Sequence, residues 1–220
     1  MFDAVVGDLD AKRTFDLNVA SRAAPSRSRC KRLLDIAVAA ALLLLLSPVF
    51  VAIALCIRAE SKGPAFFRQS RGGLRGRPFT IYKFRTMRVM ENGEQVLQAR
   101  RRDPRITPLG AFLRKTSMDE LPQLINVLKG DMSLVGPRPH AVAHDREFQE
   151  RLPIYIERFA AKPGITGLAQ VRGFRGETLT LESLEERLSA DLEYIERWSL
   201  IGDVRLLIAT LKVPLDRRAY

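Results

Sequence analysis

The sequence predicts an α+β protein that is mostly helical. Three observations support this fold class: an apolar run without a charge over 36–57, two short segments rich in β-forming residues after it, and leucines at helical spacing near the C-terminus. We therefore expect an apolar helical segment in a membrane, either a re-entrant helix hairpin or a kinked span, a small β-hairpin, and amphipathic interfacial helices around a compact domain.

The composition limits the kinds of partner. The chain has 220 residues, a net charge of +11 and an isoelectric point near 10.2. An anionic partner is therefore expected: nucleic acid, an anionic membrane surface or a phosphorylated substrate. Cys30 and Cys56 lie in a basic stretch and in the apolar run, which argues against a disulfide framework. His140 and His144 show no zinc-binding pattern and are expected at the surface.

The chain divides into three parts. Residues 1–26 are weakly periodic, lack the apolar core of a signal peptide, and are predicted to form a flexible tail. Residues 27–62 hold a basic flank and the apolar run. Residues 63–220 hold the compact domain, which is expected on the cytoplasmic face of a membrane and ends in amphipathic helices.

The apolar run is long enough to cross a bilayer, because its 22 residues would extend about 33 Å as a helix. Two features argue against a straight span. Ser47 and Pro48 interrupt the run at its centre. Both flanks are basic, and the positive-inside rule would keep both on the cytoplasmic side. A helix that enters, breaks at Ser47-Pro48 and returns satisfies both features. Spanning helices kinked by proline are common, so the residues alone leave both topologies open.

A β-hairpin is predicted after the apolar run. Residues 65–67 and 79–82 are rich in β-forming side chains, and glycines and Pro78 lie between them. This pattern is typical of two strands joined by a long loop. Lys83 and Arg85 follow the second predicted strand.

The second half of the chain is predicted to be mostly helical. A helix interrupted at Pro153 is expected over 146–159, and a short strand over 169–171. Leucines at helical spacing predict an amphipathic helix over 181–198. The last apolar segment, 200–213, is expected either in a membrane interface or in the core.

One stretch, 116–139, gathers residues that favour phosphate chemistry. It reads TSMDELPQLINVLKGDMSLVGPRP. Asp119 and Glu120 lie side by side where a helix is predicted to begin, because Pro122 is tolerated only in a first turn. Asp119 would then face the positive end of the helix dipole. Gly130 is the expected end of that helix.

Two explanations of these carboxylates remain open. Arg114 precedes the pair, and Arg138 follows it in a stiff Gly-Pro-Arg-Pro turn. Carboxylates set among arginines beside a helix N-terminus suit phosphate chemistry. Ser117 and Glu120 also match a capping box, in which the carboxylates would only terminate the helix.

A set of motifs along the chain is specific to one family. The motifs are Ser47-Pro48 in the apolar run, KFRTM at 83–87, DPRIT at 103–107, LRKTSMDELPQ at 113–123, GDMSLVGPRP at 130–139, KPGITGLAQV at 162–171 and DxxYIxxWSL at 191–200. Through them the chain resembles, over about 31–213, the bacterial sugar transferases. These are monotopic phosphoglycosyl transferases that move a sugar-1-phosphate from a UDP-sugar onto undecaprenyl phosphate.

The resemblance implies a covalent mechanism at the carboxylates. Asp119 would be the nucleophile toward the β-phosphate of the UDP-sugar and a ligand of magnesium, the expected cofactor. Glu120 would complete a catalytic dyad, with capping, metal binding and proton handling all open as its role. Phosphates of the substrates would be bound by four basic residues: Arg114, Arg138, Lys83 and Arg85.

The resemblance also implies substrates and a location. UDP-sugar, undecaprenyl phosphate and a bilayer with anionic lipids are the expected partners, nucleic acid is not, and a homodimer stays open. The enzyme would act at the cytoplasmic face of a bacterial inner membrane, through a re-entrant helix broken at Ser47-Pro48. Residues 171–178 resemble family members that transfer glucose-1-phosphate or galactose-1-phosphate in exopolysaccharide synthesis. The alternative is a non-enzymatic module that binds anionic lipids, which leaves Asp119 and Glu120 unexplained.

Overall fold

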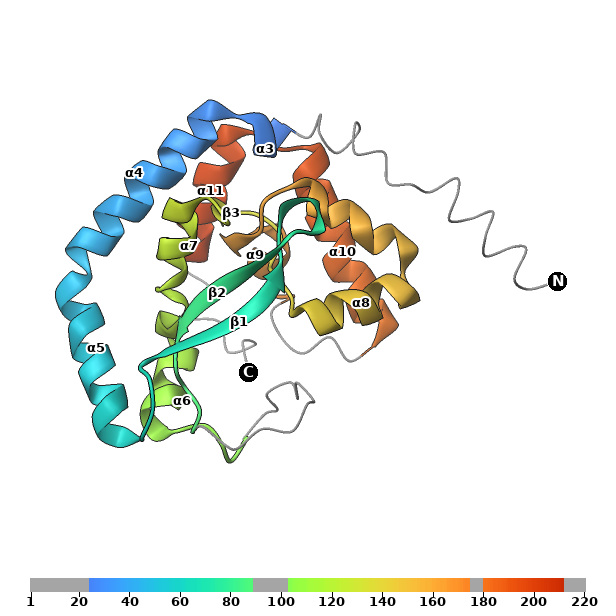
Figure 1. Ribbon diagram of the computed structural model, residues 1–220. Helices are drawn as coiled ribbons and strands as arrows, with labels where there is room; N and C mark the ends of the chain where they lie inside the picture. Colours follow the sequence, from blue (N-terminus) through green and yellow to red (C-terminus); the bar gives the residue numbers. More distant parts are fainter. Residues whose placement is uncertain (1–23, 89–102, 175–179, 212–220) are drawn as a thin grey trace.

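The computed structural model describes residues 24–88, 103–174 and 180–211. The tail predicted over 1–26 lies outside these residues except for its last three, and the sugar-related segment 171–178 lies outside them from 175 onward. The described part is a mostly helical α+β protein with two small sheets, which confirms the predicted class (Figure 1). A short helix, α3 (Ala24–Arg27), begins it.

The apolar run forms two helices that bend at the predicted place. The axes of α4 (Arg29–Leu45) and α5 (Ser47–Glu60) differ by 61°. Pro48 has no N–H to offer the carbonyl of Leu44 in the preceding turn. Ser47 Oγ donates to that carbonyl instead, at 2.8 Å, so the break leaves no orphaned acceptor there.

In the described part of the chain, no single helix is both long and apolar enough to cross a membrane, whereas this bent pair meets the criterion together. The pair forms one edge of the molecule (Figure 1). It exposes large apolar side chains, which include Leu33, Leu44, Leu45, Val51 and Leu55. Re-entry into a membrane stays a prediction.

The basic start of α4 is turned toward the globular part. Lys31 Nζ donates to Asp203 Oδ2 at 2.6 Å, and both side chains are buried. Arg32 donates to two backbone carbonyls across the same interface. Asp35, one turn further, accepts from Ser133 Oγ at 3.1 Å. Two cations of the predicted basic flank therefore anchor α4 instead of facing solvent.

The β-hairpin is confirmed, with longer strands and a shorter connection than predicted. β1 (Phe66–Gly72) pairs antiparallel with β2 (Pro78–Phe84), from Phe66 opposite Phe84 to Gly72 opposite Pro78. The 3₁₀ turn η1 (Leu74–Gly76) joins them. Lys83 is part of the second strand and does not follow it.

The helix predicted at the carboxylates begins later than expected. After α6 (Pro108–Lys115), residues Met118–Glu120 form a 3₁₀ turn, η2, and the α-helix α7 (Gln123–Lys129) follows. Ser117 has a left-handed backbone with φ of 58°, which turns the chain between α6 and η2. Gly130 ends α7 with φ of 90°, as predicted.

A second, parallel sheet joins β3 (Ser133–Val135) to β4 (Gly164–Thr166). The strand predicted over 169–171 is wrong, because these residues belong to helix α9 (Leu168–Val171). The strand forms earlier, at Gly164–Thr166, because these residues pair with β3. That pairing partner is remote in sequence, and a local pattern of β-forming residues does not reveal it.

The remaining helices are α8 (Val142–Arg151), the 3₁₀ helix η3 (Pro153–Ala160), α10 (Leu181–Glu196) and α11 (Leu200–Thr210). The predicted interruption at Pro153 is confirmed, since α8 stops before it. Figure 1 places α8 and α10 at the edge of the molecule opposite α4 and α5.

α11 has two apolar faces. Leu206 and Leu207 contact the main hydrophobic cluster, together with Trp198 just before the helix. Ile201 and Ile208 are exposed. The helix therefore packs against the core on one side and exposes apolar side chains on the other, and its place in a membrane interface stays a prediction.

Candidate active site

Glu120 is held by two cations. Lys83 Nζ donates to Glu120 Oε1 at 2.7 Å. Arg138 makes a bidentate pair, with Nη2 donating to Oε1 at 2.6 Å and Nη1 to Oε2 at 3.0 Å. The Glu120 side chain is only 14% exposed, so water screens these pairs weakly.

The side chain of Asn126 joins strand β2, which carries Lys83, to helix α7, which follows Glu120. Asn126 of α7 accepts from the N–H of Tyr82 at 3.0 Å, and its Nδ2 donates to the carbonyl of Thr80 at 2.7 Å. Lys83 is the next residue of β2, and Glu120 closes η2 just before α7. Asn126 therefore fixes the strand that carries the lysine to the helix beside the glutamate.

Arg138 comes from the turn after β3. The N–H of Gly136 donates to the carbonyl of Thr166 at 2.8 Å. A Cβ at Gly136 would lie 2.3 Å from the carbonyl oxygen of Lys162, so only glycine permits this close approach. The turn is held against β4, and the Arg138 side chain extends from it to Glu120.

Asp119 differs from Glu120 because its carboxylate is not paired. It makes no side-chain hydrogen bond or ion pair with any described residue. Burial raises the pKa of Asp119 to about 6, and the negative charge of Glu120 adds to the rise. Three cations oppose it: Lys83, Arg138 and Arg114. At neutral pH Asp119 is therefore a half-buried carboxylate with free lone pairs.

The two neighbouring carboxylates have pKa values that are pushed apart. Burial alone would raise the pKa of Glu120, but Arg138 and Lys83 outweigh it and hold that pKa well below its usual range. Glu120 thus stays ionised, whereas the pKa of Asp119 is about 6. Such a separation is typical of sites in which the two groups have different chemical roles.

A capping box is not formed. Ser117 makes no side-chain capping bond to a described residue, and α7 begins after Pro122 without one. Glu120 directs both carboxylate oxygens to the two cations and not to the backbone of Ser117. Asp119 lies inside η2 and not at the start of the α-helix. The geometry therefore decides against the capping explanation that the sequence left open.

The other two predicted cations lie in different surroundings. Arg114, in the last turn of α6, is half-buried and close enough to Asp119 to lower its pKa. Arg85 is not brought to the carboxylates. Its guanidinium donates to the carbonyls of Ser61 at 2.7 Å and Lys62 at 2.9 Å, beyond the end of α5. Arg85 therefore neutralises the negative end of that helix.

Sequence reasoning missed Arg71. Its Nη1 donates to the carbonyl of Pro139 at 3.2 Å, beside Arg138. Burial, and then the charge of Arg138, lowers the pKa of Arg71 to about 10. Lys83 pairs with Phe67 in the hairpin register, so Arg71 and Lys83 lie on the same face of the sheet. A predicted register could have found this residue.

His140 is buried, which corrects the expectation that it lies at the surface. Its side chain is enclosed because it follows the Arg138 turn into the protein, where Nδ1 lies 2.6 Å from the Tyr155 hydroxyl. Burial, and then the charge of Arg158, holds the pKa of His140 well below its usual range, so the imidazole is neutral. His144 is half-buried.

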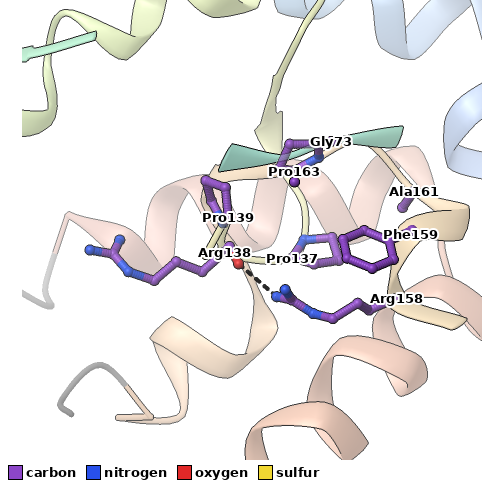
Figure 2. A pocket seen from close by; sticks show the side chains of 9 residues that line it. Gly73, Pro137, Arg138, Pro139, Arg158, Phe159, Ala161 and Pro163 are labelled. Carbon is purple, nitrogen blue, oxygen red and sulfur yellow. Dashed lines mark hydrogen bonds between the residues drawn. The ribbon is translucent and has the colours of Figure 1, made fainter. Parts of the chain in front are cut away.

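A small pocket lies behind the Arg138 turn. Figure 2 shows that the Arg138 side chain points away from this pocket, while its carbonyl points toward Arg158. Arg158 Nη2 donates to that carbonyl at 2.6 Å. Asp119 and Glu120 do not line the pocket, which is therefore separate from the two carboxylates.

The donor set suits a magnesium ion that binds together with a substrate. The described residues contain no group of three acidic, histidine or cysteine side chains that could hold a metal. Magnesium commonly uses one or two carboxylates and completes its shell with water and substrate phosphates. Asp119 offers an unpaired carboxylate, whereas the oxygens of Glu120 are occupied by cations. Asp119 is thus the residue of this pair that fits the metal.

Known proteins match nearly the whole chain. The model of the bacterial sugar transferase family matches residues 26–217. A UDP-glucose:undecaprenyl-phosphate glucose-1-phosphate transferase of Caulobacter vibrioides is 55% identical, over 82% of this chain and 68% of that protein. A protein of the same name from Escherichia coli is 53% identical, over 86% of this chain but only 41% of that protein.

The exopolysaccharide production protein PSS of Rhizobium leguminosarum is 43% identical, over 85% of this chain and 96% of that protein. This chain thus spans less than half of the Escherichia coli relative and nearly all of the Rhizobium one. The family match covers the bent helix pair, the hairpin and the Asp119–Glu120 site alike. The chain belongs to the bacterial sugar transferase family, as the motifs indicated.

Proposed function

We propose that this chain transfers a hexose-1-phosphate from a UDP-sugar to undecaprenyl phosphate and releases UMP. Glucose is the first choice of sugar, because the Caulobacter and Escherichia coli relatives are named for UDP-glucose. UDP-galactose is the donor to compare with it. The observation that carries the chemistry is the unpaired carboxylate of Asp119, next to a Glu120 that Lys83 and Arg138 hold in place.

In the first step, a carboxylate oxygen of Asp119 attacks the β-phosphorus of the UDP-sugar. A bond forms between that oxygen and phosphorus, and the bond from the β-phosphorus to the oxygen that bridges the two phosphates breaks. UMP leaves with the bridging oxygen. The protein then carries the phosphosugar on Asp119 as an acyl phosphate, and no proton has to be transferred.

In the second step, a phosphate oxygen of undecaprenyl phosphate attacks the same phosphorus. The bond to Asp119 breaks, which restores the carboxylate, and the product is a sugar linked to undecaprenyl diphosphate. Covalent catalysis of this kind divides one difficult transfer into two easier ones.

Lys83 and Arg138 would reduce the repulsion between the anionic substrates and the anionic nucleophile. Glu120 stays ionised and fixes the directions of Lys83 and Arg138 before substrate arrives. Fixed charges of this kind stabilise developing charge without reorganisation during the reaction. Arg114 adds a further cation on the side of Asp119.

We include magnesium in the proposal. Asp119 and the substrate phosphates would hold it, and its charge would neutralise phosphate oxygens when it is bound. Excess EDTA is expected to abolish turnover, and addition of magnesium should restore it. Full activity in excess EDTA would remove the metal from the proposal.

We place the site at the cytoplasmic face of a bacterial inner membrane. Undecaprenyl phosphate keeps its tail in the bilayer and its phosphate at the headgroup level, so the site must lie at that depth. The exposed apolar residues of α4 and α5, and of α11, offer surfaces for such an interface. Basic residues around them would bind anionic lipids.

The experiment uses purified protein in detergent with magnesium, undecaprenyl phosphate and UDP-glucose or UDP-galactose labelled in the sugar. Organic-soluble label with one donor is the expected result. Without the acceptor, label should stay on the protein and UMP should be released in equal amount. Absence of transfer from either donor would favour a lipid-binding module without enzymatic activity.

A further inference from the structure

The proposed chemistry leaves a buried network around Arg158 unused. Arg158 lies on η3 and is 3% exposed. It donates to Asp191 Oδ2 on α10 through Nε at 3.2 Å and through Nη2 at 2.8 Å. Its Nη1 donates to the Tyr155 hydroxyl at 2.9 Å and lies 3.2 Å from His140 Nδ1. The three guanidinium nitrogens of Arg158 therefore all have partners inside the protein.

One contact connects this network to the active site. Arg158 Nη2 also donates to the main-chain carbonyl of Arg138 at 2.6 Å (Figure 2). The side chain of Arg138 leaves the same residue in another direction and pairs with both oxygens of Glu120. Arg158 therefore bonds the backbone of the residue whose side chain pairs with Glu120.

We propose that Arg158 is a positioning residue for the transfer reaction and that it acts on Glu120 only through Arg138. This inference rests on the proposed function of the Lys83–Glu120–Arg138 cluster. Arg158 is too deeply buried and too fully paired to bind a substrate phosphate itself. Its contribution is to hold the turn that presents Arg138.

The fork shape of the side chain is essential to this role. One planar guanidinium reaches the Arg138 carbonyl, Asp191 and Tyr155 at once. A lysine keeps the positive charge but offers a single nitrogen, which cannot serve three partners in different directions. Arg158→Lys therefore keeps the positive charge and removes the hydrogen bonds that need the planar fork.

The test compares the kinetics of Arg158→Lys, Arg138→Gln and the double variant. Arg158→Lys is expected to lower kcat/KM for the UDP-sugar by about tenfold, which is the size of one misplaced hydrogen-bonding group. The loss should divide between kcat and KM as it does in Arg138→Gln. In the double variant Arg158→Lys should add no further loss, because its route to Glu120 is already removed.

Multiplicative losses in the double variant would overturn the proposal, because they show that Arg158 acts by another route. Unchanged kinetics in folded Arg158→Lys would also overturn it. If this variant does not fold, Tyr155→Phe removes the hydroxyl that accepts from Nη1 and that also bonds Asp145 and His140. Its smaller loss should likewise vanish in the Arg138→Gln background. Persistence of that loss there contradicts the proposal.

Arg151→Lys is the matched control. Arg151 Nη2 pairs with Glu147 Oε1 at 2.6 Å on α8, but both side chains are about half exposed and neither contacts the Arg138 turn. This variant should keep wild-type kinetics. Wild-type protein that transfers no sugar would refute the proposed function and this inference together, whereas active wild type with an equally active Arg158→Lys refutes the inference alone.

Discussion

Asp119 and Asp191 are both aspartates set among arginines, yet the structure places them in opposite surroundings. Asp191 is 1% exposed, and Arg158 donates to its carboxylate twice. Asp119 is half-buried and unpaired among the described residues. A carboxylate whose lone pairs are occupied holds a structure together, whereas one with free lone pairs can attack phosphorus. The hydrogen-bonding capacity left over, and not the neighbouring residue types, distinguishes the two.

The candidate active site contains the same contrast between adjacent residues. Glu120 resembles Asp191, because Lys83 and Arg138 occupy its oxygens. Those bonds draw the two cations toward Glu120 and leave Asp119 open. In the proposed mechanism Glu120 thus has a structural role, and Asp119 has the chemical one.

The largest expected effects come from exchanging the two aspartates for neutral residues. Asp119→Asn should lower turnover at least about a thousandfold, because an amide is not a nucleophile toward phosphorus. Its melting temperature at neutral pH should not fall and should rise somewhat, since no described partner is lost and burial makes the charge of Asp119 unfavourable in the folded state. Label from the UDP-sugar should no longer remain on the protein.

Asp191→Ala should show the reverse pattern. It leaves Arg158 charged and buried without its carboxylate, a loss of roughly 3–5 kcal/mol in the free energy of unfolding. Thermal denaturation measures this loss. The comparison fails if Asp119→Asn retains substantial turnover, or if Asp191→Ala is as stable as the wild type.

The pH profile is the second test of the contrast. The pKa of Asp119 is raised to about 6, so kcat/KM should fall about tenfold per pH unit below pH 6 as the nucleophile is protonated. The same shift makes ionisation of Asp119 unfavourable in the folded state. Stability from this group is full below its ordinary pKa and is lost as pH rises from about 4 through 6. Asp119→Asn should remove this pH dependence of the melting temperature.

Glu120→Gln should move the acidic limb of the profile. The negative charge of Glu120 helps to raise the pKa of Asp119, so its removal should shift that limb to lower pH. Turnover at neutral pH should also fall, by about ten- to a hundredfold, because Lys83 and Arg138 lose the carboxylate that directs them. An acidic limb that stays at pH 6 would mean that the limb does not report Asp119.

Local patterns predicted the elements well where side chains alternate or recur along the chain. Apolar spacing identified the helices of the second half, and the β-forming segments identified the hairpin. The late start of α7 was not predictable in this way. The late start follows the turn at Ser117, whose backbone is left-handed. A serine rarely adopts this conformation, and no neighbouring residue predicts it.

Only part of the candidate site could be predicted from the sequence, because the sequence does not show which group each lysine or arginine pairs with. Lys83 and Arg85 are two residues apart, yet Lys83 pairs with Glu120 and Arg85 pairs with the end of α5. Alternation along a strand would place both side chains on one face, but β2 ends at Phe84 and the Arg85 guanidinium instead reaches the carbonyls of Ser61 and Lys62. Arg71 was missed for the converse reason, because only the pairing register places it on the same face of the sheet as Lys83.

Arg85→Lys tests whether Arg85 stabilises the end of α5 or binds substrate, and a moderate loss of stability is expected. Loss of the fork should weaken the contacts with Ser61 and Lys62 and lower the free energy of unfolding by about 1–3 kcal/mol. The KM for undecaprenyl phosphate should stay within about twofold at a temperature where the variant is folded, if Arg85 binds no substrate. A raised KM with an unchanged melting temperature would return Arg85 to the substrate site.

Pro48→Ala is expected to have the smallest effect on purified protein, and it tests the proposed topology. An alanine N–H can bond the Leu44 carbonyl that Ser47 Oγ now satisfies, which favours one continuous helix in place of the bent pair. A straight helix would carry the N-terminus across the membrane. Ala20→Cys, in a protein without Cys30 and Cys56, should resist an impermeant thiol reagent in intact cells and become labelled when Pro48 is also replaced. Ala219→Cys should stay protected in both.

The labelling should be partial, because proline is not the only feature that sets the path of α4. Crossing would separate the buried pair of Lys31 and Asp203, at a cost of roughly 3–5 kcal/mol, and would also break the contact of Asp35 with Ser133. Lys31→Met in the Pro48→Ala background should therefore increase the labelled fraction. Labelling of Ala20→Cys with Pro48 still present would refute the re-entrant topology. Equal protection with and without Pro48 would show that the polar anchors of α4, and not the proline, hold both ends on one side.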